Sequence, residues 1–386
     1  MVTRLLSVGT AVPDARLRQS GIRDLFASQP GVDRLTGRLI AAAFDRSGIE
    51  TRYAVIGGAD GLSPAFAGDG DRLLAPTTGE RNAIYRREAP PLSAAAAGDA
   101  ILRSGHEAAE ITHVVTASCT GFFAPGPDFL LVRDLGIPRT VERYHIGFMG
   151  CAAAFPALRA ATRICDAQPG SVALVVCTEL CSLHLRTSSD PEQIVASAVF
   201  GDGAAAAIVS SATPRTDDAL LEVGGFTTAV THEGEQDMDW TIGDHGFEMR
   251  LTAEVPRIIG REIVGVVDRM LGSGSGGADG DGTEAVERID GWAVHPGGRS
   301  VLDRVQAGLG LPDELMGHSR AVLRDYGNMS SATILFILRR MLADESLGDG
   351  AQLAGLCFGP GLTVETARFT RRSSGPGSRS AGEASA

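Results

Sequence analysis

Residues 145–165, HIGFMGCAAAFPALRAATRIC, place one cysteine between a glycine and a run of alanines, where a strand-like apolar segment turns into a helix. Apolar residues recur at helical spacing through residues 155–165. Cys151 is therefore predicted at a helix N-terminus, where unpaired N–H groups and the helix dipole lower the pKa of a thiol. The stretch alone favours a reactive thiol and a buried core cysteine about equally.

Composition indicates a soluble globular protein. The chain has 386 residues, of which 44% are hydrophobic and 21% charged, and its net charge is -12. That charge, with no basic stripe to offset it, argues against nucleic acid as the main partner. No apolar run reaches the length of a membrane span, and residues 1–14 lack the pattern of a signal peptide. We expect a cytoplasmic protein.

The six cysteines form neither a CxxC pair nor a metal-finger spacing. Most of them lie in apolar runs, where a free cysteine behaves as a small hydrophobic residue. A reduced cytoplasmic protein without a bound metal fits this usage better than a disulfide framework.

The order of strand-like and helix-like segments predicts an α/β protein built from two similar halves, 1–212 and 219–370. The run VFGDGAAAAIV in the first half has the same form as LAGLCFGPGLTV in the second, an apolar run on each side of a Gly-x-Gly turn. Residues 371–386 are polar and rich in Gly and Ser, which predicts a disordered tail.

Two more residues are candidates for a site with Cys151. His295 ends an apolar strand and precedes Pro-Gly-Gly, so its ring should face a cavity lined by loops. Asn328, in YGNMSSAT, lies at an expected helix start, where it would either cap the helix or donate its amide to an oxyanion. Each signal is weak alone, but a nucleophile, a base and an oxyanion donor form a coherent set.

Five motifs then carry a family resemblance over nearly the whole chain: GFMGC at 147–151, FGDGAAA at 200–206, WAVHPGG at 292–298, YGNMSSAT at 326–333 and FGPGLTVE at 358–365. The chain resembles the type III polyketide synthases, the chalcone and stilbene synthase family, whose fold is the thiolase-like αβαβα layered fold. The resemblance implies a homodimeric acyltransferase with no cofactor, whose substrates are CoA thioesters.

The resemblance also implies roles at matching positions. Cys151 matches the nucleophile that holds the starter acyl group, and His295 the histidine that keeps the thiolate ionised. Asn328 matches the asparagine that stabilises the enolate formed when malonyl-CoA loses CO2. Phe200 falls on the gatekeeper phenylalanine between the CoA tunnel and the cavity. Met249 falls on a second gatekeeper, which is phenylalanine in the family.

Further site residues follow from the same alignment of motifs. Cys119 replaces a threonine of the plant enzymes, and Ala124 stands where they carry a methionine that reaches into the partner's cavity. The substrate-binding residues implied are Phe200, Met249, Cys119, Ala124, Cys181, Ser330 and Gly297. The CoA-binding residues implied are Arg46 and Ser300, a thin basic cluster that leaves delivery by an acyl-carrier protein open.

The sequence looks most similar to bacterial members that extend fatty acyl starters to alkylresorcinols or alkylpyrones, and small residues at 119 and 124 would suit an alkyl tunnel. Three alternatives stay open: a ketoacyl synthase III-like condensing enzyme, a cysteine thioesterase or hydrolase, and a noncatalytic lipid-binding relative. Starter length, the number of extensions and the mode of cyclisation are not determined by the sequence.

Overall fold

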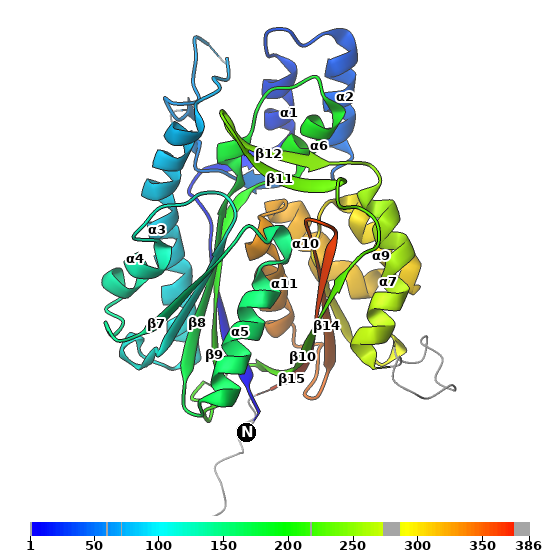
Figure 1. Cartoon of the computed structure of the whole chain (residues 1–386). Helices are drawn as coiled ribbons and strands as arrows, with labels where there is room; N and C mark the ends of the chain where they lie inside the picture. Colours follow the sequence, from blue (N-terminus) through cyan, green and yellow to red (C-terminus); the bar gives the residue numbers. More distant parts are fainter. Residues whose placement is uncertain (1, 59–60, 71, 217, 273–285, 374–386) are drawn as a thin grey trace, which may run out of the picture.

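The structure is a computed structural model that describes residues 2–58, 61–70, 72–216, 218–272 and 286–373 (Figure 1). With η for a 3-10 helix, the first part of the chain contains β1 (Arg4–Ala11), β2 (Arg16–Arg18), α1 (Gln19–Ala27), α2 (Arg34–Asp45), β3 (Thr51–Tyr53), β4 (Gly57–Gly58), β5 (Gly61–Leu62), α3 (Thr78–Ser104), η1 (Ala108–Glu110), β6 (His113–Ser118), α4 (Pro127–Asp134), β7 (Glu142–Gly147), η2 (Gly150–Ala152), α5 (Ala154–Ala167), β8 (Val172–Leu180), η3 (Cys181–His184), α6 (Pro191–Val199) and β9 (Asp202–Ser210). The second part contains β10 (Leu220–Val230), β11 (Met238–Gly243), β12 (Gly246–Leu251), α7 (Val255–Leu271), β13 (Gly291–Val294), α9 (Arg299–Leu309), η4 (Asp313–Met316), α10 (Gly317–Tyr326), η5 (Ser330–Ala332), α11 (Thr333–Leu342), β14 (Gln352–Gly359) and β15 (Thr363–Arg372).

One large mixed sheet contains two strand sets of the same order. Its strands run β13-β14-β15-β10-β1-β9-β8-β6-β7. In the first set β1 and β8 are antiparallel to β9, and β6 is parallel to β8. In the second set β10 and β14 are antiparallel to β15, and β13 is parallel to β14. The sets meet where β1 pairs with β10, at Arg4↔Glu222 and Leu5↔Leu221.

Helices cover the two strand sets in layers (Figure 1). Helix α3 packs on β1, β8 and β9, while α7 packs on β10 and β15 and against α9. Helices α5 and α11 lie between the sets, since α5 contacts β8 and β15 and α11 contacts β1 and β13. This arrangement confirms the predicted thiolase-like α/β fold.

Small residues let these layers approach closely. All nine residues of β8 and all nine of β9 are buried, as expected for strands covered on both faces. A Cβ on Gly9 of β1 would lie 2.2 Å from the Ala96 carbonyl oxygen of α3, so only glycine permits this approach. The helix and the sheet therefore pack backbone against backbone at this point.

Two expectations about element bounds differ from the structure. Strand β15 continues through residues 371–372, where it pairs with β10, so the tail begins later than predicted. The rest of the predicted tail, residues 374–386, lies outside the described residues. The helix expected directly at Asn328 begins only at Thr333, because η5 intervenes. Asn328 is therefore not the cap of α11.

Candidate active site

Cys151 lies in a tight turn between β7 and α5, within η2. The backbone is left-handed at Phe148 (φ 56°) and at Gly150 (φ 57°). A Cβ on Gly150 would also lie 2.6 Å from Cδ of Pro360, so this position requires glycine. Positive φ at a phenylalanine is strained, and such strain is found at functional sites. The turn holds the sulfur against the second half of the chain.

His295 follows the last residue of β13. Its backbone N–H donates to the Leu356 carbonyl at 2.8 Å, which extends the pairing of β13 with β14 by one residue. The side chain is 0% exposed, and neither ring nitrogen has a hydrogen-bond partner among the described residues. Buried polar groups normally have partners. The free imidazole is therefore available to a thiol proton or a substrate oxygen.

Asn328 is held by backbone from the first half of the chain. Its N–H donates to the Val199 carbonyl at 2.8 Å, and its carbonyl accepts from Gly201 N–H at 2.9 Å. Its side-chain Oδ1 accepts from Ser330 N–H at 2.8 Å. Both Oδ1 and Nδ2 lie 3.8 Å from Cys151 Sγ. The amide thus faces the sulfur across the junction of the two halves.

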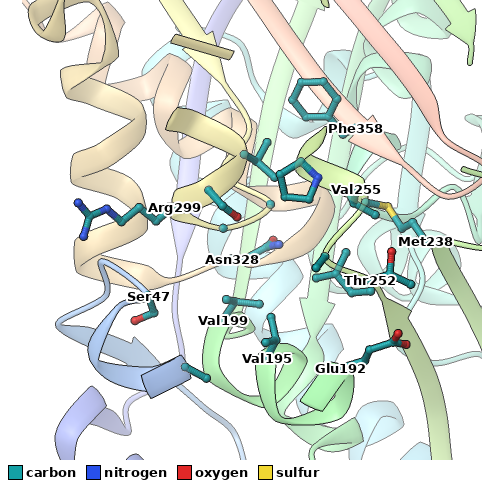
Figure 2. Close-up of a pocket in the computed structure, with 18 of the residues that line it drawn as sticks. Ser47, Glu192, Val195, Val199, Met238, Thr252, Val255, Arg299, Asn328 and Phe358 are labelled. Carbon is teal, nitrogen blue, oxygen red and sulfur yellow. The ribbon is translucent and has the colours of Figure 1, made fainter. Parts of the chain in front are cut away.

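All three residues line one cavity of about 760 Å³. Figure 2 shows Val195 and Val199 on one side and Val255 and Phe358 on the other, with Asn328 between them in this view. The predicted residues that share this cavity are Phe200, Met249, Gly297, Arg46 and Ser300. The structure therefore brings Cys151, His295 and Asn328 together with five of the nine predicted substrate- and CoA-binding residues.

Burial is the largest cause of the pKa shifts of Cys151 and His295. It raises the pKa of the Cys151 thiol to about 11, although hydrogen bonds from Ser330 and Asn328 lower it. Burial also lowers the pKa of His295 to about 3. The expected lowering of the thiol pKa by the helix N-terminus is therefore wrong: Cys151 precedes α5 by three residues, and the loss of water outweighs the helix. A thiolate at this buried position needs an opposite charge or hydrogen bonds to stabilise it.

The remaining predicted cysteines line a second, smaller space. This space of about 20 Å³ lies next to Cys151, and its lining residues include Cys119, Cys181, Ser330 and Trp240. This is room for roughly one water molecule. The Trp240 indole N–H donates to the Cys119 carbonyl at 2.7 Å. Trp240 is therefore one wall of the space beside residue 119, which in this structure is too small to hold an alkyl chain.

Glu179 is a buried residue of this region that the sequence analysis missed. Its carboxylate accepts from Cys119 N–H at 3.1 Å, Thr120 Oγ1 at 2.9 Å and Ser331 Oγ at 2.5 Å. Burial raises its pKa. The available signal was a single glutamate in the otherwise uncharged run SVALVVCTEL.

Ala124 does not reach these spaces. It is exposed, lies in a loop at a cis Ala124–Pro125 peptide, and lines none of the cavities around Cys151 in the described chain. A single chain therefore gives Ala124 no contact with the substrate. The predicted role would need a second copy of the chain.

Four arginines line the mouth of the large cavity, three more than the sequence predicts. Besides Arg46, which directly follows α2, it is lined by Arg257 of α7 and by Arg299 and Arg304 of α9. Arg257 pairs with Glu254 at 2.5 Å, whereas no ion pair is found for Arg46 or Arg304 among the described residues. Folding thus adds three arginines to the predicted Arg46, because α7 and α9 come to the mouth only in the tertiary structure.

The described residues contain no group of three or more His, Cys, Asp or Glu side chains that could hold a metal ion. Among the same residues, no helix combines the length and apolarity needed to cross a membrane.

A nucleophile, an imidazole and an amide at the junction of two similar halves define a condensing acyltransferase of the thiolase-like fold. Residues 2–214 match the N-terminal domain, and residues 226–371 the C-terminal domain, of chalcone and stilbene synthases. The chain belongs to this family, the type III polyketide synthases.

Individual relatives agree with this assignment. The chain is 33% identical over 370 residues to a 3,5-dihydroxyphenylacetyl-CoA synthase of Streptomyces toyocaensis, covering 94% of this chain and 89% of that protein. It is 31% identical, with the same coverage, to the alpha-pyrone synthesis polyketide synthase-like Pks18 of Mycobacterium tuberculosis. It spans only 11% of the length of a probable polyketide synthase 1 of Dictyostelium discoideum, at 31% identity over 94% of this chain. The crystal structure of the C-terminal type III domain of Steely1 from Dictyostelium matches with a TM-score of 0.84 and 28% identity, over 96% of this chain and 99% of that one.

Proposed function

We propose that the chain loads an acyl group from an acyl-CoA onto Cys151 and extends it with malonyl-CoA by repeated decarboxylative Claisen condensation. The product is then cyclised and released. The observation that carries this proposal is the convergence of Cys151, His295 and Asn328 on one cavity large enough for a thioester substrate. No resident cofactor takes part.

Loading begins with proton transfer from the Cys151 thiol to the unpartnered imidazole of His295. The thiolate attacks the acyl-CoA carbonyl, the C–S bond to CoA breaks, and the imidazolium returns the proton to the leaving CoA thiolate. Burial penalises each charge alone, but the two charges formed together attract strongly in a site that excludes water.

Extension uses Asn328 and His295, which line the same cavity as Cys151. The Asn328 amide, 3.8 Å from Sγ, and the His295 ring donate to the thioester oxygen of malonyl-CoA as CO2 leaves. Such donors stabilise the enolate and lower the barrier. The enolate carbon then attacks the acyl group on Cys151, which frees the sulfur and lengthens the chain by two carbons.

For the product we favour an alkylresorcinol or alkylpyrone. The support is the likeness to a relative named for alpha-pyrone synthesis and the apolar lining near Val195, Val199 and Val255. Because the space beside Cys119 and Trp240 is only about 20 Å³, a long alkyl starter must move these side chains or remain in the large cavity.

We propose CoA, rather than a carrier protein, as the usual source of both thioesters. Arg46 and Arg304 are cations without an ion-pair partner among the described residues, at the mouth of a cavity that ends at Cys151. Guanidinium groups bind phosphate strongly. Delivery by an acyl-carrier protein would use the same entrance.

We also propose a cytoplasmic homodimer. Strand β7 is an edge of the sheet, and almost all its residues are exposed. Tyr144 of this strand is 46% exposed, and Phe122 and Phe129 are each 41% exposed. Exposed edges and large apolar side chains favour pairing with another chain. A second copy on this edge would place its loop at Ala124 close to the interface.

All six cysteines are buried and free, which suits a reducing compartment such as the cytoplasm.

The test is to incubate the purified chain with malonyl-CoA and starters from acetyl-CoA to palmitoyl-CoA and to identify products by mass. Cyclised products two or more carbons longer than the starter are expected, and Cys151→Ala should form none. Release of free acid without any need for malonyl-CoA would instead identify a thioesterase. Tight binding of acyl-CoA without turnover would identify a lipid-binding relative.

A further inference from the structure

Phe200 and Asn328 belong to one backbone unit that joins the two halves of the chain. They form an isolated parallel bridge, in which Asn328 N–H donates to the Val199 carbonyl and Gly201 N–H donates to the Asn328 carbonyl. Any shift of the segment at Phe200 therefore moves Asn328, and with it the amide that faces Cys151.

Arg52 of β3 lies directly behind this unit. It is only 2% exposed, and its Nη1 donates to the Ser197 carbonyl at 2.8 Å and the Phe200 carbonyl at 2.6 Å. Its stem fills the space beside Gly327, where a Cβ would lie 3.0 Å from Arg52 Cγ and Cδ. The guanidinium thus touches the Phe200 side of the bridge, and the stem touches the residue before Asn328.

The residues next to Arg52 tie the same segment to the loop that carries Asn328. Thr51 Oγ1 donates to the Asp325 carbonyl at 2.7 Å, and the ring of Tyr53 stacks on that of Tyr326 with centroids 5.8 Å apart. Glu50 N–H donates to the Arg324 carbonyl at 2.8 Å. Residues 50–53 therefore contact residues 324–327 along their length and hold them in place.

A buried arginine at this place is costly. Its Nε and Nη2 have no hydrogen-bond partner among the described residues, and its guanidinium carbon lies 5.6 Å from the centre of the Phe44 ring. Burial lowers the pKa of Arg52 to about 9, while the charge of Asp202 opposes this shift. Removing one partner of a buried charge pair is destabilising, so a substitution at Arg52 acts on stability through Asp202 as well. An effect on catalysis must therefore be separated from an effect on folding.

We propose that Arg52 is a positioning residue for the condensation. Arg52 holds the Phe200 carbonyl and fills the space beside Gly327. It thereby fixes the position of the Phe200–Asn328 bridge and directs the Asn328 amide towards the thioester oxygen. The inference rests on the proposed function, since it concerns the decarboxylation step.

Arg81 provides a matched control. It is also a buried arginine, at 0% exposed, and its Nη1 donates to the carbonyls of Leu183 and Leu185. Its guanidinium carbon lies 5.1 Å from the centre of the Phe66 ring. Among the described residues, Arg81 makes no hydrogen bond to the Phe200–Asn328 bridge. It therefore matches Arg52 as a buried arginine but lacks the proposed positioning role.

The experiment compares Arg52→Met, Arg52→Lys and Arg81→Met in three measurements: thermal unfolding, malonyl-CoA decarboxylation, and alkylation of Cys151 by iodoacetamide. Arg52→Met should lower kcat for decarboxylation by about 100-fold, the cost of a displacement of about 1 Å at a catalytic group. KM should change little, and the alkylation rate should fall far less than kcat, because a displaced Asn328 costs the sulfur only a long hydrogen bond. Arg52→Lys, which keeps one donor, should recover part of kcat, and Arg81→Met should leave kcat of the folded protein unchanged.

Equal losses of decarboxylation and alkylation, or a kcat for Arg52→Met within about twofold of the unmodified value, would overturn the inference. If Arg52→Met does not fold, Arg52→Lys carries the same comparison. Absence of decarboxylation in the unmodified chain would refute the proposed function itself, which separates the two failures.

Discussion

Replacing His295 with alanine is expected to leave the Cys151 thiolate without the cation that forms when the thiol proton passes to the imidazole. With a neutral imidazole, burial raises the thiol pKa to about 11, and Ser330, Asn328 and Glu179 also act on it. The variant should keep the thiol near this raised pKa. In the unmodified chain a paired imidazolium should bring the pKa into the range of about 3.5–7.5 known for activated cysteines. The substitution should therefore move the apparent pKa upward by about four units or more.

The expected rate change is smaller than the change in thiolate population. At neutral pH a thiol with a pKa of about 11 is ionised to roughly one part in ten thousand. The more basic thiolate is also more nucleophilic, by about 0.4–0.5 log units for each pKa unit, which returns roughly two of the four orders of magnitude. Alkylation of Cys151 at neutral pH should therefore slow by about 100-fold.

The assay is the rate of iodoacetamide labelling between about pH 5 and pH 11, followed at the peptide that contains Cys151 by mass spectrometry. Asn328→Ala is the matched control, since it removes the other side chain near the sulfur and keeps the imidazole. The thiol pKa of this control should rise much less than that of His295→Ala, because only one hydrogen bond to the sulfur is lost. If His295→Ala and the unmodified chain give the same profile, the imidazole does not hold the thiolate, and the proposed loading step is wrong.

Three other changes test separate parts of the site. Arg304→Ala should raise KM for malonyl-CoA about tenfold but leave KM for a malonyl thioester of N-acetylcysteamine unchanged, because only CoA carries phosphates; Arg139→Ala, at an exposed arginine away from the cavity mouth, is the control, and equal effects on both thioesters would contradict the assignment. Trp240→Ala should open the space beside Cys119 and raise kcat/KM for decanoyl-CoA relative to hexanoyl-CoA about tenfold, measured by product mass; an unchanged ratio would show that the indole does not limit the starter. Gly355→Ala should lower the free energy of unfolding by about 1–3 kcal/mol in urea titrations, because the new Cβ would lie 2.5 Å from the Phe155 ring; a loss no larger than that of Gly37→Ala, where the nearest atom is 3.8 Å away, would refute this.

The nucleophile, the histidine and the asparagine could be predicted from sequence because local chemistry marks each of them. Glycine precedes Cys151 where the turn needs a positive φ and a close approach to Pro360. Pro-Gly-Gly follows His295 at the end of a buried strand, and Gly327 (φ 71°) precedes Asn328. The α/β class followed similarly from runs of apolar residues, since strands such as β8 and β9 are buried along their whole length.

The electrostatics of the site depend on the tertiary structure instead. Position in sequence suggested a helix N-terminus that would lower the Cys151 pKa, but burial among residues far along the chain raises it. Glu179 is likewise only a glutamate in a strand until Cys119, Thr120 and Ser331 close around its carboxylate. A pKa depends on the water removed and the charges nearby, and neither is a local property of the sequence.

The shape of the site is also decided by folding. Arg304 lies nearly 260 residues from Arg46 in the sequence, yet both stand at the mouth of one cavity. Trp240 comes from a hairpin that no motif marks, and it lines the small space beside Cys119. The sequence by itself determined the family and the reacting groups, because these depend on residue type and local backbone. The tertiary structure decided charge, volume and access, because these depend on which distant segments pack together.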